Sequence, residues 1–260
     1  MNETPQDRFT FVVPARMASR RFPGKVLKAL GGRAVLDWVY NNCSRSRFCG
    51  GVIVGTDAQE VRDHCQKRNW AVCMTREHNC CSNRTAEVVS ALSGEWIVEV
   101  QSDEPFLWAS TIDRWLERAI PLLGSTTKID VFISASELPA AHVENPNFVK
   151  IIKNADDKLL WASRSKIPSC FGGRMATFFR HAGLYLWRRE SLLRFAEIAP
   201  GPIEDSEDTH ALRLLENEFW AQVILMPGTQ GIDVPADLVA AERYVWDNRA
   251  LIAEETGLQP

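Results

Sequence analysis

The chain has 260 residues, of which 45% are hydrophobic and 24% charged, a composition typical of a globular domain with a substantial core. Its net charge of -3 argues against a nucleic-acid or anionic-membrane partner. No apolar run approaches the roughly 20 residues of a membrane span, and the polar start lacks the apolar core of a signal peptide. Seven cysteines without repeated spacing indicate free thiols, so we expect a soluble, cytoplasmic protein.

The first half of the chain alternates short apolar runs with segments of helical periodicity. We predict strands at 9–13, 51–55, 70–74 and 96–100, separated by helices that include 34–43, 59–69 and 86–92. Strands and helices that alternate at this spacing are typical of βαβ units and of a parallel sheet.

The pattern changes after about residue 125. Strand-like runs with fewer helices between them occur at 131–136, 149–153, 159–163 and 183–187, followed by a helix at 205–217, a strand at 222–226 and a terminal helix from 236. We therefore predict an α/β fold in which a mostly parallel sheet carries a smaller mixed-sheet subdomain, within a single domain over 1–260.

The loop after the first strand is basic and contains Arg16, Arg21 and Lys25. In an open α/β sheet, ligands bind at the carboxyl ends of the strands. Arginine offers a planar fork and lysine a mobile point charge, which together suit a triphosphate, and Gly24 allows a sharp turn. The loop is neither a P-loop nor GxGxxG. Composition alone leaves a phosphate-binding loop and a merely solvated basic loop equally possible.

The sequence of this loop, PAR-x-x-S-x-R-x-P-G-K, resembles the opening of the CMP-KDO synthetases, which are 3-deoxy-manno-octulosonate (KDO) cytidylyltransferases. Further segments resemble blocks of that family in the same order along nearly the whole chain. These segments are Val54–Asp57, Cys73–Arg76, Ala86–Val88, Val100–Pro105, Asn145–Asn147, Ser163–Pro168, Arg180–Tyr185 and Gly231–Pro235.

The resemblance implies a Rossmann-like nucleotidyltransferase that moves CMP from CTP to a small acid and releases pyrophosphate, as in lipopolysaccharide synthesis. It implies that about 9–125 form the CTP-binding half and that about 126–235 form the acceptor-binding subdomain, after which the chain returns to the main sheet. We expect residues 236–260 to form the terminal helix. The resemblance also implies a homodimer. The positions that match nucleotide-binding residues are Pro14, Ala15, Arg16, Ser19, Arg21, Lys25, Asn79, Ser82, Arg84 and Gln101.

Two aspartates each follow a predicted strand, Asp103 in VQSDEP and Asp233 in GIDVP. Mg²⁺ commonly takes one or two carboxylates together with substrate phosphates. The resemblance implies that both hold Mg²⁺ between CTP and the acceptor, and that they form the catalytic set with Arg16 and Lys25. For a lone aspartate the alternative is a helix cap or a turn.

The chain departs from the family pattern at two places. Where the family has HxSGT followed by an acid and Arg, this sequence has His78-Asn-Cys-Cys-Ser-Asn-Arg84, and the loss of Gly removes backbone freedom. The family's LEQLR helix reads Thr209-His-Ala-Leu-Arg213, so His210 replaces a Glu that contacts sugar hydroxyls. The other acceptor-binding positions implied by the resemblance keep the family's residue types: Gln101, Arg164, His181 and Tyr185.

The exchange at His210 leaves the acceptor open. An ionised carboxylate only accepts hydrogen bonds, whereas an imidazole can donate or carry positive charge and so suits an anion. The acceptor is then KDO or a similar sugar acid, or else a phosphonate such as phosphonoformate, unless His210 merely fills space. A remoter alternative is a nucleotide-binding relative without activity, although all four residues of the catalytic set are present.

Overall fold

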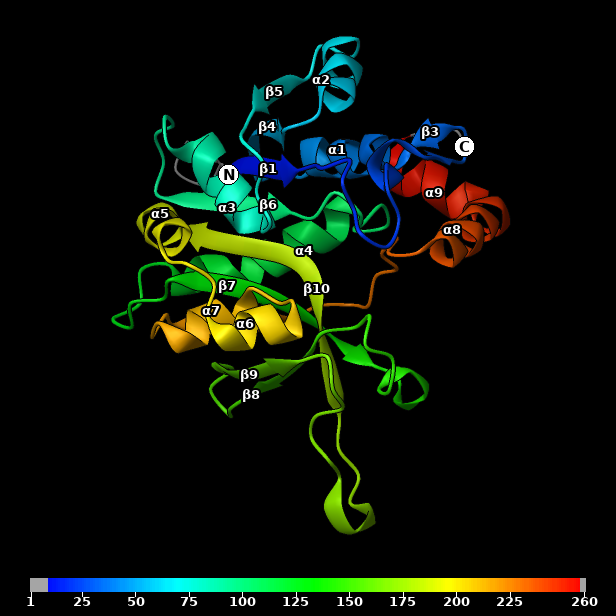
Figure 1. The fold of residues 1–260 in the computed structure, drawn as a ribbon. Helices are drawn as coiled ribbons and strands as arrows, with labels where there is room; N and C mark the ends of the chain where they lie inside the picture. Colours follow the sequence, from blue (N-terminus) through cyan, green and yellow to red (C-terminus); the bar gives the residue numbers. More distant parts are fainter. Residues whose placement is uncertain (1–8, 258–260) are drawn as a thin grey trace.

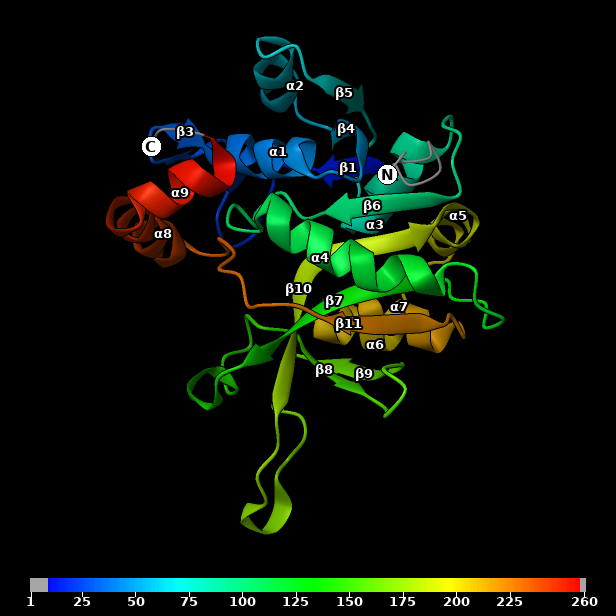
Figure 2. The same ribbon diagram turned by 180° about the vertical axis from the view of Figure 1, so that it is seen from behind.

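The computed structural model describes residues 9–257, and its centre is a nine-stranded sheet flanked by helices (Figures 1 and 2). The strands of this sheet are β1 (Phe9–Pro14), β4 (Cys49–Thr56), β5 (Ala71–Met74), β6 (Trp96–Val100), β7 (Val131–Leu138), β8 (Lys150–Lys153), β9 (Leu159–Ser163), β10 (Phe178–Arg188) and β11 (Ala221–Leu225). The α-helices are α1 (Val35–Arg45), α2 (Gln59–Gln66), α3 (Cys81–Val89), α4 (Ala109–Ala119), α5 (Arg189–Glu197), α6 (Pro202–Glu207), α7 (Ala211–Glu216), α8 (Pro235–Asp247) and α9 (Arg249–Thr256).

The main path of the sheet runs in the order β11-β7-β10-β6-β1-β4-β5. All neighbouring strands on this path are parallel except β10, which is antiparallel to both β6 and β7. The prediction of a mostly parallel sheet flanked by helices is therefore confirmed. Because the parallel strands point the same way, the loops that follow β1 and β6 meet at one edge of the sheet.

The side chains of β1 show how the sheet forms two cores. Phe11 and Val13 pack into one cluster together with residues of α1 and α4, whereas Val12 belongs to a second cluster with residues of α3, α5 and α7. All three β1 side chains are fully buried, as expected of a strand covered on both faces. Figures 1 and 2 show these two helical layers from opposite sides.

The mixed-sheet region predicted after residue 125 shares strands with the main sheet. β7, β10 and β11 lie on the main path, and only β8 and β9 extend from the outer part of β10. The pairing of β10 with β7 shifts between His181 and Tyr185, where Gly183 adopts φ 75°. A side chain at this φ is strained, so glycine allows the irregularity that separates the two parts of β10.

Two predicted helices are each divided in the structure. The helix expected at 205–217 is interrupted at Asp208, whose φ of 46° is left-handed, so that α6 and α7 are separate. The terminal helix is interrupted at Asn248, between α8 and α9. The sequence predicted helices here but not these breaks, since Asp and Asn fit within a polar helical stripe. None of the helices in residues 9–257 is long and apolar enough to cross a membrane.

Candidate active site

Lys25 brings together three segments that lie far apart in the sequence. Its ammonium nitrogen is 2.5 Å from Asp103 Oδ2 and 3.4 Å from Asp233 Oδ1, and it donates to the Ile232 carbonyl at 2.7 Å. Lys25 follows the loop after β1, Asp103 follows β6, and Asp233 immediately precedes the N-cap of α8. Asp103 and Asp233, which the sequence analysis assigned to a metal ion, therefore both contact the ammonium group of Lys25.

The charges in this cluster modify one another. Burial would lower the pKa of Lys25, but the carboxylates of Asp103 and Asp233 hold that pKa above its ordinary value. Burial and the charge of Asp103 raise the pKa of Asp233, while Lys25 and Arg21 oppose that rise. Two carboxylates this close to each other favour cations in the site, whether ammonium, guanidinium or a metal ion.

The basic loop surrounds the same cluster. Arg21 donates to Asp233 Oδ1 at 2.7 Å and to Asn147 Oδ1 at 2.6 Å, so it links the loop to two distant segments. Arg16 is exposed and makes one long contact, 3.4 Å, to the Asn79 carbonyl. Gly24 has φ 71° and allows the turn that aims Lys25 inward. Arg16 is thus held by no short bond to the described residues and is free to reach a phosphate.

The remaining predicted residues of this loop help to fix the conformation of its backbone. Pro14 ends β1, and the buried Ala15 donates its backbone N–H to the Gly55 carbonyl at 2.8 Å. Ser19 donates its N–H to the Met17 carbonyl at 2.9 Å in a tight turn. These three positions hold the loop at the carboxyl edge of the sheet.

The predicted nucleotide-binding residues of the 78–84 segment fall into different environments. Arg84 is 2% exposed and donates to Asp57 Oδ2 at 2.7 Å and to Thr75 Oγ1 at 2.5 Å, so its guanidinium ties α3 to the ends of β4 and β5. Ser82 is fully buried and bonds inward, whereas the Asn79 carbonyl faces Arg16. The structure thus brings Asn79 near the basic loop and places the other two in the protein interior.

Arg164 and Gln101, two predicted acceptor-binding residues, lie beside the junction of the main sheet and β8. The Arg164 guanidinium donates to the carbonyls of Pro146, Glu207 and Asp208 at 2.7 to 2.9 Å. It therefore holds two connecting segments against β9. Gln101 is half-buried, and its backbone N–H donates to the Gly183 carbonyl at 2.9 Å.

His181, Tyr185 and His210 form a row of rings on one face of β10. The ring centres of His181 and Tyr185 are 4.6 Å apart, and those of Tyr185 and His210 are 5.4 Å apart. Burial, with His210 and Arg180 nearby, lowers the pKa of His181 to about 3. Its Nε2 is buried without a hydrogen-bond partner among the described residues. The predicted acceptor residues of β10 and α7 are thus neighbours.

Glu104, next to Asp103, is a carboxylate that sequence reasoning did not select. Burial raises its pKa to about 7, and it accepts a hydrogen bond from Thr229 Oγ1 at 2.8 Å. A Cβ at Gly183 would lie 2.7 Å from Glu104 Cγ, and one at Gly231 would lie 2.9 Å from its Oε1. Two glycines thus make room for Glu104, and only its place in DEP, beside a strand-end aspartate, hinted at a role.

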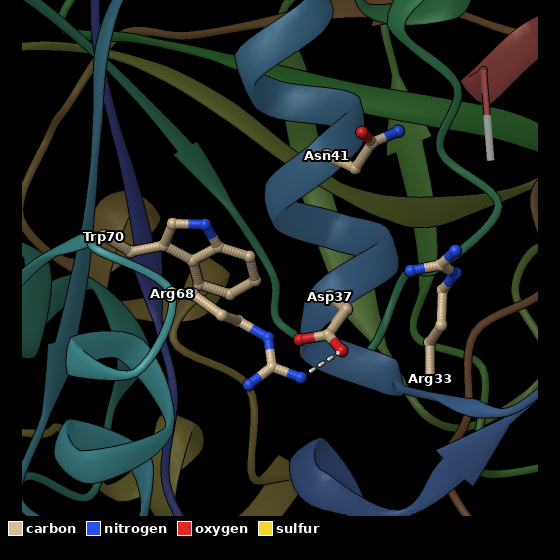
Figure 3. A pocket seen from close by; sticks show the side chains of 5 residues that line it. All are labelled: Arg33, Asp37, Asn41, Arg68 and Trp70. Carbon is tan, nitrogen blue, oxygen red and sulfur yellow. Dashed lines mark hydrogen bonds and ion pairs between the residues drawn. The ribbon is translucent and has the colours of Figure 1, made fainter.

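A cavity of about 240 Å³ lies elsewhere, between α1 and the end of α2 (Figure 3). Asp37 on its wall accepts from Arg68 at 3.0 Å and is 2.6 Å from His64 Nε2. None of the sequence-predicted site residues lines this cavity. The bonds to Asp37 join α1 to α2, so we assign them a structural role.

Asp103 and Asp233 make a small donor set for a metal ion. Within residues 9–257, no three His, Cys, Asp or Glu side chains gather as a self-sufficient metal site. Mg²⁺ does not need one, because it commonly keeps waters and takes one or two carboxylates with substrate phosphates. The oxygen-only pair therefore fits Mg²⁺ better than zinc, which prefers nitrogen and sulfur ligands.

The family model described as "Cytidylyltransferase" matches residues 10–224, so this chain belongs to the cytidylyltransferase family. The chain is similar to the "3-deoxy-manno-octulosonate cytidylyltransferase" of Pelobacter propionicus, with 34% identity over 250 residues that cover 90% of this chain and 96% of the relative. The enzyme of that name from Koribacter versatilis is 34% identical over 246 residues, which cover 94% and 92%.

Solved structures agree with this assignment. The structure of CMP:2-keto-3-deoxy-manno-octonic acid synthetase complexed with CTP superposes with a TM-score of 0.84 and 26% identity, covering 93% of this chain and 99% of the other. A 4-diphosphocytidyl-2C-methyl-D-erythritol synthase from Anaerococcus prevotii shares the fold, with a TM-score of 0.60 and 14% identity over 92% and 97% of the chains. The protein is a CTP-dependent nucleotidyltransferase, and the predicted family is confirmed.

Proposed function

We propose that this protein transfers CMP from CTP to KDO or a closely similar sugar acid and releases pyrophosphate. The observation that carries the proposal is the convergence of Lys25, Asp103 and Asp233 at the carboxyl edge of the sheet, in a chain whose relatives are named for this reaction. An acceptor oxygen attacks the α-phosphorus in line with the leaving pyrophosphate. Such a reaction needs positioning and charge stabilisation more than a nucleophilic side chain.

Within this proposal the basic loop binds the triphosphate. Arg16 is exposed with one long contact, so it is available to grip phosphate oxygens, and Lys25 supplies a buried positive charge beside the carboxylates. Asp103 and Asp233 would hold Mg²⁺, which when bound polarises the phosphate and the attacking oxygen. Arg21 keeps Asp233 in place through its 2.7 Å bond and links it to Asn147.

The acceptor lies, in this proposal, against Gln101 and the row of rings formed by His181, Tyr185 and His210. Arg164 acts by holding the segments at Pro146 and 207–208 around it. A phosphonate acceptor would be favoured by positive charge on His210. Burial lowers the pKa of His210, however, so a neutral ring is expected at neutral pH, which favours a hydroxyl-bearing sugar acid.

We also propose that the protein works as a cytoplasmic homodimer. The segment between β9 and β10 projects from the body (Figure 1), and its Phe171 and Met175 side chains are 90% and 94% exposed. Large apolar side chains on a projecting segment are typical of an interface, and a second copy would cover them. The free thiols of Cys43, Cys65, Cys73, Cys80, Cys81 and Cys170 suit a reducing compartment.

The experiment that tests the reaction measures pyrophosphate release with Mg²⁺, each of four nucleoside triphosphates, and either KDO or phosphonoformate. We expect the highest rate with CTP and KDO. Turnover of phosphonoformate in the absence of any KDO turnover would contradict the sugar-acid proposal. Omitting the divalent cation should abolish product formation, and full activity without it would contradict the metal roles of Asp103 and Asp233.

A further inference from the structure

A chain of polar groups connects Glu99, near the end of β6, to His210, the N-cap of α7. Ser82 Oγ donates to Glu99 Oε1 at 3.0 Å, and His210 Nε2 lies 3.3 Å from the same Ser82 oxygen. Glu99 and Ser82 are fully buried, and Glu99 pairs with Tyr185 across the sheet. An ionisable side chain such as Glu99 is unusual in a strand covered on both faces, so its hydrogen bond with Ser82 points to a function.

The donors and acceptors available on Glu99, Ser82 and His210 determine which group donates in each hydrogen bond. A hydroxyl has one proton, and an ionised carboxylate can only accept. Once Ser82 gives its proton to Glu99, its oxygen can only accept from His210, so the His210 proton must be on Nε2. Burial raises the pKa of Glu99, and His210, Thr85 and Ser82 offset only part of that rise, so the direction of the chain rests on the geometry of the Ser82 hydroxyl, which donates to Glu99 Oε1.

The position of the ring is set independently of this contact. Arg213, one turn further along α7, donates to both oxygens of Glu204 at 2.6 Å and to Asn83 Oδ1 at 3.0 Å. These bonds join α7 to α6 and α3, so the start of α7 cannot drift away from Ser82. The other ring nitrogen, Nδ1 of His210, has no hydrogen-bond partner among the described residues, and the residue as a whole is half-buried.

We propose that Glu99 and Ser82 are positioning residues that hold His210 in its Nε2–H tautomer, so that its Nδ1 lone pair accepts a hydrogen bond from a hydroxyl of the acceptor. This inference rests on the proposed function insofar as the acceptor carries hydroxyls. A neutral imidazole with a fixed lone pair does what an ionised carboxylate does at this place, namely accept a hydroxyl proton. His210 thereby remains compatible with a sugar-acid acceptor.

The charges around His210 agree with a neutral ring. Burial is the largest influence and lowers its pKa, and Arg213 acts in the same direction. The carboxylates of Glu99, Glu204 and Asp208 oppose this but do not outweigh it. Because the ring stays neutral at neutral pH, one nitrogen must keep its lone pair, and the Ser82 contact decides which one.

The first test reads the tautomer directly and needs no acceptor. Protein labelled with ¹⁵N-histidine is measured by NMR at neutral pH, and the His210 signals are those lost in His210→Asn. We expect the Nε2–H pattern in the wild type and a mixture of tautomers in Ser82→Ala. Ser90→Ala, at the exposed end of α3, should leave the pattern unchanged. An Nδ1–H or cationic ring in the wild type, or an unchanged ring in Ser82→Ala, would overturn the proposal.

The second test asks whether Nδ1 meets the acceptor. An Asn side chain places its amide oxygen near the position of Nδ1, whereas a Gln side chain places its amide group near Nε2. We expect His210→Gln to raise the KM for KDO about tenfold more than His210→Asn does, the size of one hydrogen bond. Neither change should alter the KM for CTP, and Ser82→Ala should raise the KM for KDO.

The outcomes separate the two proposals. Equal KDO effects in His210→Gln and His210→Asn would overturn the lone-pair role even where the protein uses KDO. If the protein turns over no hydroxylated acid at all, the proposed function fails, while the NMR result still decides whether Glu99 and Ser82 set the tautomer. The exposed His142 provides a matched control, since His142→Gln and His142→Asn should leave both KM values unchanged.

Discussion

The two ends of the candidate site are built in different ways. At the phosphate end, charged side chains from the loop after β1 and the segments before α4 and α8 meet one another, with Lys25 touching both Asp103 and Asp233. At the acceptor end, the groups are mostly neutral and buried, and the contacts are a row of rings and one hydrogen-bond chain through Ser82. In the function we propose, the first end acts through charge and the second through the geometry of donors and acceptors.

The two ends also differ in how readily their side chains can be replaced. Charges that must neutralise a triphosphate and a metal ion leave few substitutes, because each lost charge leaves its partners uncompensated. A hydrogen-bond acceptor can be provided by several side chains, if its surroundings fix the lone pair. The chain departs from the family pattern at the 78–84 segment and at His210, and Ser82 and His210 from these two places contact each other.

The largest effect is expected when the phosphate end loses a carboxylate. Asp103→Ala removes one proposed metal ligand and leaves Lys25 with Asp233 alone, so we expect kcat to fall about 10³-fold. Asp233→Ala should act in the same direction. Steady-state kinetics at saturating Mg²⁺ provide the measurement, with Asp63→Ala on the exposed surface of α2 as the control. Near wild-type rates in both Asp103→Ala and Asp233→Ala would mean that the metal is held elsewhere.

A smaller but still large loss is expected from the cation of the same cluster. Lys25→Ala should lower kcat/KM about 10²-fold, as the loss of one preorganised charge does. Lys25→Arg should also fail, because a planar guanidinium does not fit where one nitrogen bonds two carboxylates and the Ile232 carbonyl. Lys28→Ala, three residues on and exposed, is the matched control. If Lys25→Arg retains full activity, the charge alone matters and the geometry of Lys25 does not.

The sequence anticipated the contacts of Lys25 with Asp103 and Asp233 better than the contact of Ser82 with His210, for physical reasons. Strand periodicity placed Asp103 after β6, and the parallel topology then required it to lie near the loop that carries Lys25. The contact between Ser82 and His210 joins residues 128 positions apart and follows from how α3 and α7 pack on the sheet. No spacing in the chain encodes that packing. The sequence did not single out the buried Glu99.

The helix breaks show the same limit. The prediction of one helix over 205–217 followed the apolar spacing of the segment, but Asp208 adopts a left-handed conformation that periodicity does not register. This break matters for the site, because it makes His210 the N-cap of α7, where its ring lies 3.3 Å from the Ser82 hydroxyl. A continuous helix would have placed His210 in the middle of a helical face.

The smallest predicted effect tests the acceptor end and concerns the free energy of unfolding at low pH. Because burial lowers the pKa of His181 to about 3, the folded protein resists a proton that the unfolded chain takes up near pH 6.5. A depressed folded pKa means that this stability is fully present above pH 6.5 and is lost as pH falls towards 3, at about 1.4 kcal/mol per pH unit. His181→Gln cannot titrate, so its free energy of unfolding should decline less steeply between pH 6 and 4, by about 1 kcal/mol per unit. Urea unfolding of both proteins at pH 6, 5 and 4 measures the slopes. Parallel slopes for the wild type and His181→Gln would mean that His181 is protonated in the folded protein, and the row of rings at the acceptor end would then be charged rather than neutral.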